Sequence, residues 1–413
     1  MNYDCVVLGA GIVGISAALN LQARGRYVCV VDRELPAAGA SIGNAGLIER
    51  SSVIPYAFPR QPGRLLRYAL NREPDVRYAP NAIPGIARWL INYWKQSGAE
   101  RLQHAAAAML PLIERCVAEH DELIDRSGIG AIVSNRGWME IFRDLKLFCA
   151  AREEAESLAR YKLSYDVLHQ REILDFEPGL NETVIGGIRW NDPKSVRDPG
   201  AMLAAYTSLF QREGGTLAKG DAQTLRRDGA MWLVESYAAN VRAENVVIAL
   251  GADSDLLCNA LGYRVPLAAK RGYHLHFHPV DHGMPKLPIC DSTGGYVLAP
   301  MAAGIRLTTG IEFARRNAPP NPIQIRRAER LARSVFRLGR QVERAPWMGR
   351  RPCLPDMRPI IGPAPNHRGV WFDFGHAHHG LTLGPVSGRL LAEQMTGAKP
   401  FTDPAPFSIT RFI

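Results

Sequence analysis

The stretch Asp4-Cys-Val-Val-Leu-Gly-Ala-Gly-Ile-Val-Gly14 decides the fold of this chain. Its apolar run, Cys5–Leu8, is typical of a buried parallel strand, and the glycines after it have the spacing G-x-G-x-x-G. The first glycine permits a tight turn, the second lets a pyrophosphate approach the backbone, and the third lets the next helix pack on the strand. The N–H groups at the start of that helix favour an anion. The predicted cofactor-binding residues in this stretch are Gly9, Gly11, Ile12, Val13 and Gly14.

The residues after the turn complete a dinucleotide-binding unit. A helix is expected to end near Gly25, and a second strand over 27–31 leads to Asp32. The Asp32 carboxylate follows Gly14 by 18 positions, close to the spacing of an acid that bonds a ribose hydroxyl. The order of strand, turn, helix, strand and acid predicts a dinucleotide rather than a glycine-rich corner, but it does not separate NAD from FAD. A second small-residue loop, 40–46, follows Arg33 and offers backbone to a longer cofactor.

Composition places the chain among globular proteins that hold no metal cage. Its 413 residues, 46% hydrophobic and 22% charged, suffice for two domains. The seven scattered cysteines form no C-x-x-C pair, so we expect neither a disulfide framework nor a zinc site, and a reducing cytoplasm fits best. No apolar run is long enough to span a bilayer, and the glycine-rich N-terminus does not resemble a signal peptide.

The net charge of +10 favours anionic ligands, nucleic acid or an anionic membrane surface. Arginines supply most of the positive charge and are spread along the chain, and no motif typical of nucleic-acid binding occurs. We therefore expect no nucleic-acid partner. The charge also fits peripheral contact with the inner face of the cytoplasmic membrane.

Residues 51–196 interrupt the regular alternation of strand and helix. Residues 51–84 predict an irregular excursion between short helices, and 102–126 predict an amphipathic helix kinked at Pro111. The strand, helix and strand expected at 137–143, 145–161 and 165–168 are not in βαβ order. They predict a separate α+β domain built on a mixed sheet.

Alternation resumes at Asp198-Pro199, which predicts the N-cap and first turn of a helix. Strands expected at 216–219, 232–235 and 245–250 return the chain to the nucleotide-binding sheet. Further elements are expected as an extended segment at 265–279, strands at 296–299 and 305–310, a basic helix at 322–338, a strand at 370–374 and a helix at 385–395. The glycine-bounded loop before this last helix is suited to a polar or anionic ligand edge.

A series of short motifs runs through the whole chain: Gly9-x-Gly-x-x-Gly14 with Asp32-Arg33, Ser41-x-x-Asn-Ala-Gly46, Ala249-Leu-Gly-Ala252, Lys270-Arg-Gly-Tyr273, Arg351-Pro-x-x-Pro-Asp356 with Pro359-Ile-x-Gly362, and Gly375-His376 followed by Gly380-Leu-Thr and Ser387-Gly-Arg. With these motifs the sequence resembles the D-amino-acid oxidase-like FAD oxidoreductases, and most closely the bacterial D-amino-acid dehydrogenases. Met357 and Ala377 stand where relatives usually carry glycine, and His378-His379 replace smaller or apolar residues.

The resemblance implies a discontinuous, Rossmann-like α/β FAD-binding domain, residues 1–50, 197–262 and 346–413, with an inserted α+β substrate domain, residues 51–196 and 263–345. It also implies positions along a noncovalently bound FAD, since Cys353 does not match the cysteine that tethers flavin in some relatives. Asp32 is expected at the adenosine ribose, Ala222 at the adenine and Ser41 at the pyrophosphate, and Arg33 and Gly251 are further cofactor-binding residues. The flavin ring is expected beside Asn44, Ala45, Gly46 and Leu47, with its pyrimidine edge at Gly380, Leu381 and Thr382.

The resemblance further implies hydride transfer from Cα–H of a D-amino acid to flavin N5, giving an imino acid that hydrolyses to a 2-oxo acid and ammonia. Arg351 is the candidate clamp for the substrate carboxylate, because a guanidinium binds a carboxylate bidentately and stays charged. The alternative is a structural ion pair with Asp356, and neighbouring Arg350 is expected in a salt bridge. Tyr296, Tyr273, His376 and His379 are further candidates for contact with the substrate, each with packing or pocket shape as the alternative.

Some alternatives stay open at this point. The substrate is also compatible with a secondary amino acid such as D-hydroxyproline, sarcosine or another N-alkyl glycine, and the electron acceptor with oxygen or a membrane quinone. A remote alternative is a nucleotide-binding module that recognises RNA or a protein. His274, His276 and His278 would share one face of a strand, yet no acidic residue or cysteine lies between them, so we expect no metal there.

Overall fold

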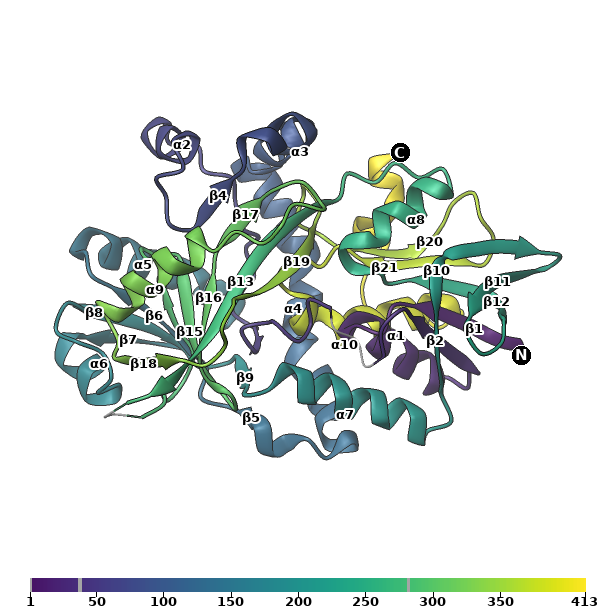
Figure 1. The fold of residues 1–413 in the computed structure, drawn as a ribbon, viewed down its shortest axis with the longest axis horizontal. Helices are drawn as coiled ribbons and strands as arrows, with labels where there is room; N and C mark the ends of the chain where they lie inside the picture. Colours follow the sequence, from purple (N-terminus) through teal and green to yellow (C-terminus); the bar gives the residue numbers. More distant parts are fainter. Residues whose placement is uncertain (1, 36–38, 281–282) are drawn as a thin grey trace.

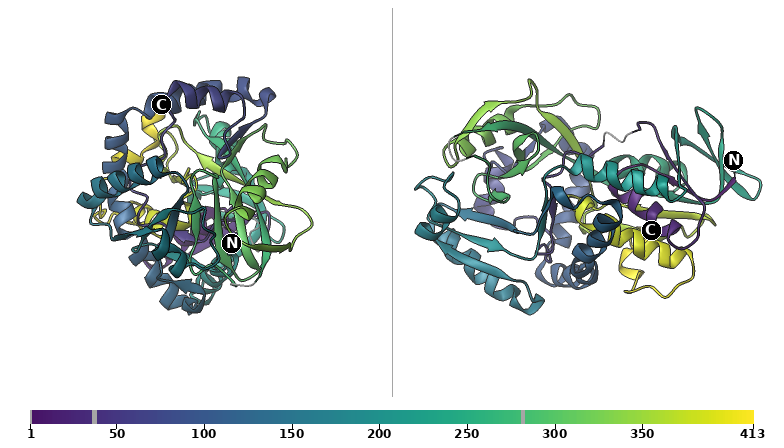
Figure 2. Two further views of the ribbon diagram at one scale, coloured as in Figure 1. Left: turned by 90° about the vertical axis from the view of Figure 1, so that its left-hand side faces the viewer. Right: turned by 90° about the horizontal axis from the view of Figure 1, so that it is seen from below.

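Two large sheets lie side by side along the long axis of the molecule, and the chain passes between them several times (Figure 1). The computed structural model describes residues 2–35, 39–280 and 283–413. Both ends of the chain belong to the same half, where the purple N-terminal strand and helix lie beside the yellow C-terminal helix. The views from the side and from below keep these two segments together (Figure 2).

The first sheet has seven strands and begins with the apolar run of the glycine motif. Its core is parallel: β1 pairs with β2 and β12, β2 with β10, and β12 with β21. β11 pairs antiparallel with β10 and β12, and β20 with β21. The bounds are β1 Asn2–Leu8, β2 Val28–Asp32, β10 Thr216–Asp228, β11 Met231–Ser236, β12 Val241–Ile248, β20 Ile360–Pro363 and β21 Val370–Phe374. This is the Rossmann-like sheet that the sequence predicts.

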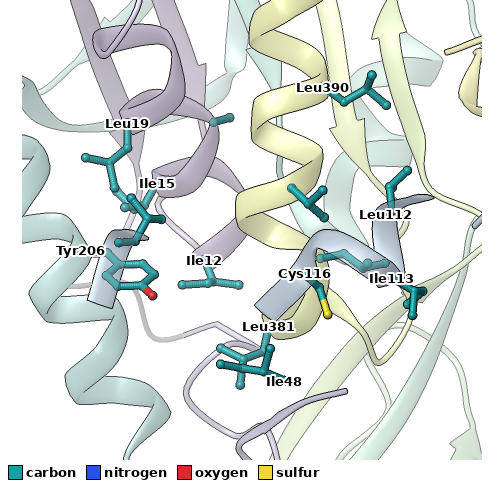
Figure 3. Close-up of a cluster of buried hydrophobic side chains, with 14 of the residues drawn as sticks. Ile12, Ile15, Leu19, Ile48, Leu112, Ile113, Cys116, Tyr206, Leu381 and Leu390 are labelled. Atoms are coloured by element: carbon teal, nitrogen blue, oxygen red, sulfur yellow. The ribbon is translucent and has the colours of Figure 1, made fainter. Parts of the chain in front are cut away.

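Helices α1 and α10 pack side by side on this sheet although they come from opposite ends of the chain. Close contact is possible because small residues meet: a Cβ on Gly388 of α10 would lie 2.8 Å from the Ala17 backbone nitrogen of α1. The long helix α4 supplies Leu112, Ile113 and Cys116 to the same buried cluster (Figure 3). The helices of this half and its border are α1 Ile12–Gln22, α4 Ala99–Ser127, α7 Pro199–Arg212, α8 Ser254–Ala260 and α10 Gly380–Met395.

The second sheet has eleven strands and is mostly antiparallel, with β13 as its hub. β13 pairs with β16 and β17 along one edge and with β18 and β19 along the other. The bounds are β4 Val76–Tyr78, β6 Trp138–Phe142, β7 Tyr165–His169, β8 Gly186–Trp190, β13 Ala268–Pro279, β14 Ile289–Asp291, β15 Tyr296–Met301, β16 Gly304–Thr309, β17 Ile311–Phe313, β18 Leu338–Gln341 and β19 Trp347–Cys353. It is the mixed sheet predicted for the inserted part of the chain.

Smaller elements complete the fold. A three-stranded sheet joins the halves, with β3 Leu47–Ile48 directly after the 40–46 loop, β9 Lys194–Val196 and β5 Val133–Ser134. The remaining helices are α2 Pro62–Ala69, α3 Ile83–Gln96, α5 Leu145–Ser157, α6 Gln170–Phe176 and α9 Ile323–Arg333, with short 3-10 turns at 80–82, 130–132, 158–161, 251–253, 405–407 and 409–412. In the described ranges, no helix combines the length and the apolar character that crossing a membrane requires.

Most predicted elements lie where the sequence places them, and the differences have physical causes. Asp198 caps α7, accepting a hydrogen bond from the Ala201 N–H at 2.9 Å, as predicted. α10 begins at Gly380, five residues before the predicted start, so Pro385 is its sixth residue; the Leu381 carbonyl that lacks a partner there lies 2.7 Å from His120 Nε2 instead. α9 ends at Arg333 rather than near 338, where the chain enters β18.

Candidate functional site

One large cavity lies between the two sheets. Its volume is about 1770 Å³, and both ends of the chain contribute to its walls together with strands of the second sheet. Most of the predicted site residues line it: Gly9, Gly11, Ile12, Val13, Asp32, Arg33, Ser41, Asn44, Ala45, Leu47, Ala222, Gly251, Tyr273, Tyr296, Arg351, His376, Gly380 and Leu381. The lining of this one cavity therefore includes residues that lie up to 372 positions apart in sequence, from Gly9 to Leu381.

The glycine turn forms one end of this cavity, and its glycines are required by geometry. Gly9 has a φ of +109°, and a Cβ there would lie 2.4 Å from the Ala249 carbonyl oxygen. A Cβ on Gly14 would lie 1.9 Å from the Gly9 carbonyl oxygen, so Gly14 serves the packing of α1 on β1 and does not line the cavity. At Gly11 only the Ser41 hydroxyl is near, at 3.4 Å. The turn is thus closed on the protein side and open toward the cavity.

Asp32 and Ser41 hold this turn from the cavity side. The Asp32 carboxylate accepts a hydrogen bond from the Ala10 N–H at 2.7 Å, and the Ser41 hydroxyl accepts one from the Ile12 N–H at 3.1 Å. Both side chains line the cavity, so their remaining acceptor and donor capacity faces a ligand. Arg33, Ala222 and Gly251 line the same cavity, and the Arg33 guanidinium lies 3.6 Å from Asp253.

Two of the predicted cofactor-binding residues act from behind the cavity wall. A Cβ on Gly46 would lie 2.3 Å from the Val196 carbonyl oxygen, so this glycine serves the close approach of β3 and β9. The Thr382 hydroxyl donates to the Leu47 carbonyl at 3.1 Å and accepts from the Glu49 N–H at 3.1 Å. Neither residue lines the cavity. They position Leu47 and the first turn of α10, which do.

The first turns of α1 and α10 both lie at the cavity, where Ile12, Val13, Gly380 and Leu381 contribute to its lining. Free N–H groups and the helix dipole make each helix start favourable for negative charge. The donor set therefore fits an FAD molecule: an open glycine turn for the pyrophosphate, an acid for the ribose, and a second helix start for the electron-rich edge of the flavin.

Arg351 lines the cavity from β19 and has no acidic partner among the described residues. Its guanidinium donates to the main-chain carbonyls of Gly310 at 2.9 Å and Thr309 at 3.2 Å. It lies flat against Gly272 of β13, where a Cβ would come within 2.5 Å of Nη2. Asp356 pairs instead with Arg358 and Arg411, so the structural alternative for Arg351 is wrong. Arg350, as expected, forms a salt bridge, binding Asp253 at 2.8 Å.

Burial lowers the pKa of Arg351, because a charged guanidinium loses hydration there. Burial, with Arg351 nearby, likewise lowers the pKa of Lys270. Lys270 is directly opposite Arg351 in the β13–β19 register, it is 4% exposed, and it lies over the rings of Tyr93 at 4.4 Å and Trp89 at 5.0 Å. Lys270 also lines the cavity and forms no ion pair within the described ranges. Two buried cations without counter-charges favour an anionic group in this part of the cavity.

The two predicted tyrosines differ in the state of their hydroxyl groups. The Tyr296 hydroxyl is buried and has no hydrogen-bond partner among the described residues. Burial, with the adjacent Asp291 carboxylate, raises the pKa of Tyr296, so it stays a protonated donor. The Tyr273 hydroxyl instead donates to Glu312 and accepts from the Asn321 N–H. The prediction that Tyr273 contacts substrate through its hydroxyl is therefore not supported.

The histidine loop also separates into different roles. His376 is 3% exposed, with Nε2 3.0 Å from the Ser387 hydroxyl and 3.4 Å from Asp373, so its ring belongs to a buried polar cluster and proton transfer to substrate is not supported. His379 does not line the cavity; its Nε2 lies 3.2 Å from Glu49. His378 lines the cavity, and its shielded Nε2 has no partner among the described residues.

Sequence reasoning missed Glu49, Tyr56 and Lys270. All three line the cavity, and the Tyr56 ring contacts the His378 ring edge to face at 4.7 Å. Lys270 stands in a quoted motif, but its proximity to Arg351 depends on the pairing of strands 81 residues apart in sequence. Glu49 could have been noticed in the sequence because it is an acidic residue directly after the apolar pair Leu47 and Ile48, at the end of the 40–48 segment.

Two groups of three side chains bring potential metal-ligand atoms within 4.8 Å of one another, in the described ranges of the chain. In the first group, His274, His276 and Glu343, the His276 ring already bonds Glu343 and accepts from Arg306 at 2.9 Å. A guanidinium at that distance opposes a metal cation. His278 is exposed and belongs to neither group. The second group is Glu49, His378 and His379.

Comparison with known proteins agrees with this geometry. Residues 4–394 match the family described as FAD dependent oxidoreductase (DAO). The chain is 31% identical to a D-amino-acid oxidase of Bradyrhizobium diazoefficiens, over 98% of both chains, and 29% identical to a D-amino acid dehydrogenase of Chromohalobacter salexigens, over 98% of this chain and 99% of the relative. The crystal structure of glycine oxidase from Geobacillus kaustophilus has the same fold, with a TM-score of 0.74, 20% identity, and coverage of 100% and 99%.

Proposed function

The chain belongs to the DAO family of FAD-dependent oxidoreductases, and from this premise we propose that it catalyses the oxidative deamination of D-amino acids. FAD is the cofactor of the family, and the residues of the cavity fit it. When bound, FAD accepts the hydride that leaves Cα of the substrate. The family assignment supports an enzyme rather than a nucleotide-binding module that recognises RNA or a protein.

The observation that carries the substrate class is Arg351. It is a half-buried guanidinium at the cavity wall that has only main-chain carbonyls as partners in the described chain. A substrate carboxylate would supply the missing negative charge. It would accept hydrogen bonds from the guanidinium N–H groups that do not bind main-chain carbonyls. Lys270 adds positive charge on the same face, and the Tyr296 hydroxyl offers one unpartnered donor. These groups orient an amino acid and exclude water from its Cα.

The direct test is anaerobic reduction of the purified yellow protein. D-amino acids, L-amino acids and N-alkyl glycines are added separately, and the loss of flavin absorbance is followed. Bleaching by primary D-amino acids supports the proposal. Bleaching by N-methyl or cyclic amino acids alone would instead identify the secondary amine as the substrate, an alternative that fits the same carboxylate clamp.

Replacement of Arg351 tests the clamp. Arg351→Leu should raise KM about 100-fold or more, because a charge-assisted bidentate contact is lost, while the yellow colour remains. The KM of Arg351→Lys should lie between those of the wild type and Arg351→Leu, since lysine keeps the charge and loses the fork geometry. A KM of Arg351→Leu equal to that of the wild type would refute the clamp.

Noncovalent binding of FAD is supported by the state of the thiols at the cavity wall. Cys290 and Cys353 line the cavity, and burial raises the pKa of both, so each stays a protonated and weakly nucleophilic thiol. Acid precipitation of the protein should leave all the flavin in the supernatant. Flavin that stays in the pellet would show a covalent bond.

The electron acceptor is oxygen or a membrane quinone, and the surface of α2 and α3 supports contact with a membrane. Leu66 and Leu70 are 62% and 51% exposed, and Ile91 and Trp94 are 54% and 44% exposed. The net charge of residues 51–104 is positive, with eight arginines and lysines against three acidic residues. Flotation with vesicles of anionic lipid tests this contact, and Leu66→Ser with Leu70→Ser should abolish it. Equal flotation of both proteins would contradict it.

A further inference from the structure

Three polar side chains converge beside the cavity wall: Glu49, His378 and His379. A carboxylate oxygen of Glu49 and one ring nitrogen of each histidine lie within 4.8 Å of one another. The Nε2 atoms of both histidines are shielded, and neither has a hydrogen-bond partner among the described residues. Glu49 lies 3.2 Å from His379 without the alignment of a hydrogen bond. Buried acceptors that lack a donor are costly, so the arrangement indicates a donor that enters from outside the chain.

The cluster is built into the fold rather than formed by mobile side chains. His378 and His379 precede α10, and the His378 carbonyl accepts from the Asn44 side chain at 3.4 Å. Glu49 is 9% exposed, and its backbone N–H is held by Thr382 at 3.1 Å. The His378 and His379 rings are 3.8 Å apart. Glu49 and His378 line the cavity that also contains Arg351.

The surrounding charges distinguish between two kinds of donor. Burial, with His379, Arg351 and Lys270 nearby, lowers the pKa of His378, so its imidazole is neutral and Nε2 can accept. The two cations oppose an isolated divalent metal ion. A zwitterion avoids this conflict, because its carboxylate neutralises the guanidinium while its ammonium group brings up to three N–H donors to the acceptors, at about 2.8–3.0 Å from each.

We propose that Glu49 and His378, with His379 beside Glu49 at 3.2 Å, form a subsite that binds an ammonium group of the amino-acid substrate while Arg351 binds its carboxylate. The inference rests on the proposed function and deepens it. The ammonium is either the α-amino group or the end of a basic side chain. The two sources share one chemistry, and the experiment below separates them.

The experiment uses the FAD-loaded wild-type protein and ligands that cannot be oxidised, and it reads binding from the shift of the flavin absorbance spectrum. 2-Aminoisobutyrate carries an α-ammonium but no Cα–H, and isobutyrate lacks the amine. 6-Aminohexanoate carries only a distal ammonium, and hexanoate lacks it. The subsite predicts that in at least one pair the amine-bearing ligand binds about tenfold more tightly than its amine-free counterpart.

Three variants show which residues produce this gain in affinity. Glu49→Gln removes the charge at constant size and should reduce the gain about tenfold, with the affinity of the amine-free ligand unchanged. His378→Leu should also reduce the gain in affinity. His378→Gln should keep part of this gain, because the glutamine amide oxygen can accept a hydrogen bond. Glu114→Gln is the matched control: Glu114 lies 3.8 Å from Arg50, outside the cavity lining, and should change neither affinity.

Each outcome decides a separate question. Loss of the gain for 2-aminoisobutyrate assigns the α-ammonium to the subsite, and loss for 6-aminohexanoate assigns a basic side chain. Absence of any gain in the wild type, or equal weakening of both ligands of a pair by Glu49→Gln, overturns the subsite. If D-amino acids still bleach the flavin in that case, the proposed function stands; if no amino acid bleaches it, the proposed function fails independently.

Discussion

Met357 and Ala377 lie on the cavity wall in left-handed backbone conformations, with φ of 57° and 53°. They are the positions at which the sequence departs from the glycines expected by resemblance. Each non-glycine residue in this conformation costs about 1–2 kcal/mol, because its Cβ approaches the following carbonyl oxygen. The chain therefore keeps the backbone path of the cofactor loops with side chains that do not favour it.

Ala377→Gly should raise the free energy of unfolding by about 1 kcal/mol, since glycine adopts the left-handed conformation without that steric cost. Urea unfolding followed by circular dichroism measures the change. Ala107→Gly, on the exposed face of α4, is the matched control and should lower the same quantity by about 1 kcal/mol. Destabilisation by Ala377→Gly would contradict the assigned conformation.

The position of a single residue at the cavity could be predicted from the sequence where one chemical requirement determines it. Asp32 and the glycine turn follow from spacing alone, and Arg351 from its motif. Tyr273 shows the limit: its motif is real, but the hydroxyl is taken by Glu312 on a strand 39 positions away. His376 and His378 are two residues apart, and only the fold decides that the His376 ring bonds Ser387 while the His378 Nε2 has no partner among the described residues.

At the level of elements, the contact of α1 with α10 holds both helix starts at the cavity. Glycines at 384 and 388 let the two backbones approach, with added Cβ atoms at 3.3 Å from the Ile12 carbonyl and 2.8 Å from the Ala17 nitrogen. A larger residue at 388 would separate the helices. The separation would move two sets of N–H donors that are expected to serve opposite ends of one cofactor.

Gly388→Val should lower the free energy of unfolding by about 1–3 kcal/mol through overpacking, and should weaken FAD retention in gel filtration. Gly85→Ala in α3 is the control, because a Cβ there meets nothing within 4 Å, and it should be neutral or slightly stabilising. Full retention of FAD and of stability in Gly388→Val would show that this contact does not position the helices.

Element types were predictable because periodicity reflects local burial, but their ends depend on contacts that are distant in sequence. α4 passes through Pro111 and extends over Ala99–Ser127, since Leu112, Ile113 and Cys116 pack beneath α1 and α10 (Figure 3). This burial outweighs the hydrogen bond lost at proline. The pairing of β13 with β16, β17, β18 and β19 could not be read from the sequence, because antiparallel register across a long insertion leaves no local signal.

At the scale of the whole molecule, buried neutral histidines couple stability to pH. Burial lowers the pKa of His120 to about 4 and that of His274 to about 3. Both values lie below the unfolded value of about 6.5, so the unfolded chain binds more protons below that pH. Stability should therefore fall as pH decreases from about 6.5, and the His120 contribution is fully lost near its folded pKa.

His120→Gln should flatten this dependence. The pKa shift of His120 corresponds to about 3 kcal/mol between pH 6.5 and 4. The glutamine amide can still donate to the Leu381 carbonyl, which His120 Nε2 approaches at 2.7 Å. Thermal unfolding across this pH range measures the slope, and His104→Gln, at an exposed position of α4, is the control. Identical slopes for the wild type and His120→Gln would contradict the assigned neutral state.

The division of the chain into a FAD-binding domain and a substrate domain follows the two sheets in outline, and its stated boundaries remain a prediction. Both ends of the chain contribute to the first sheet, and the cavity lies where the two sheets meet. The sequence predicted this meeting through glycine motifs near both ends. It could not predict the cluster of Glu49, His378 and His379, because that cluster forms only when the end of β3 and the start of α10 come together.

The most direct test of the account is a crystal structure of the FAD-loaded protein with 2-aminoisobutyrate bound. We expect FAD along the glycine turn and the start of α10, with the ligand carboxylate within hydrogen-bond distance of the Arg351 guanidinium. FAD elsewhere, or a ligand carboxylate remote from Arg351, would contradict it.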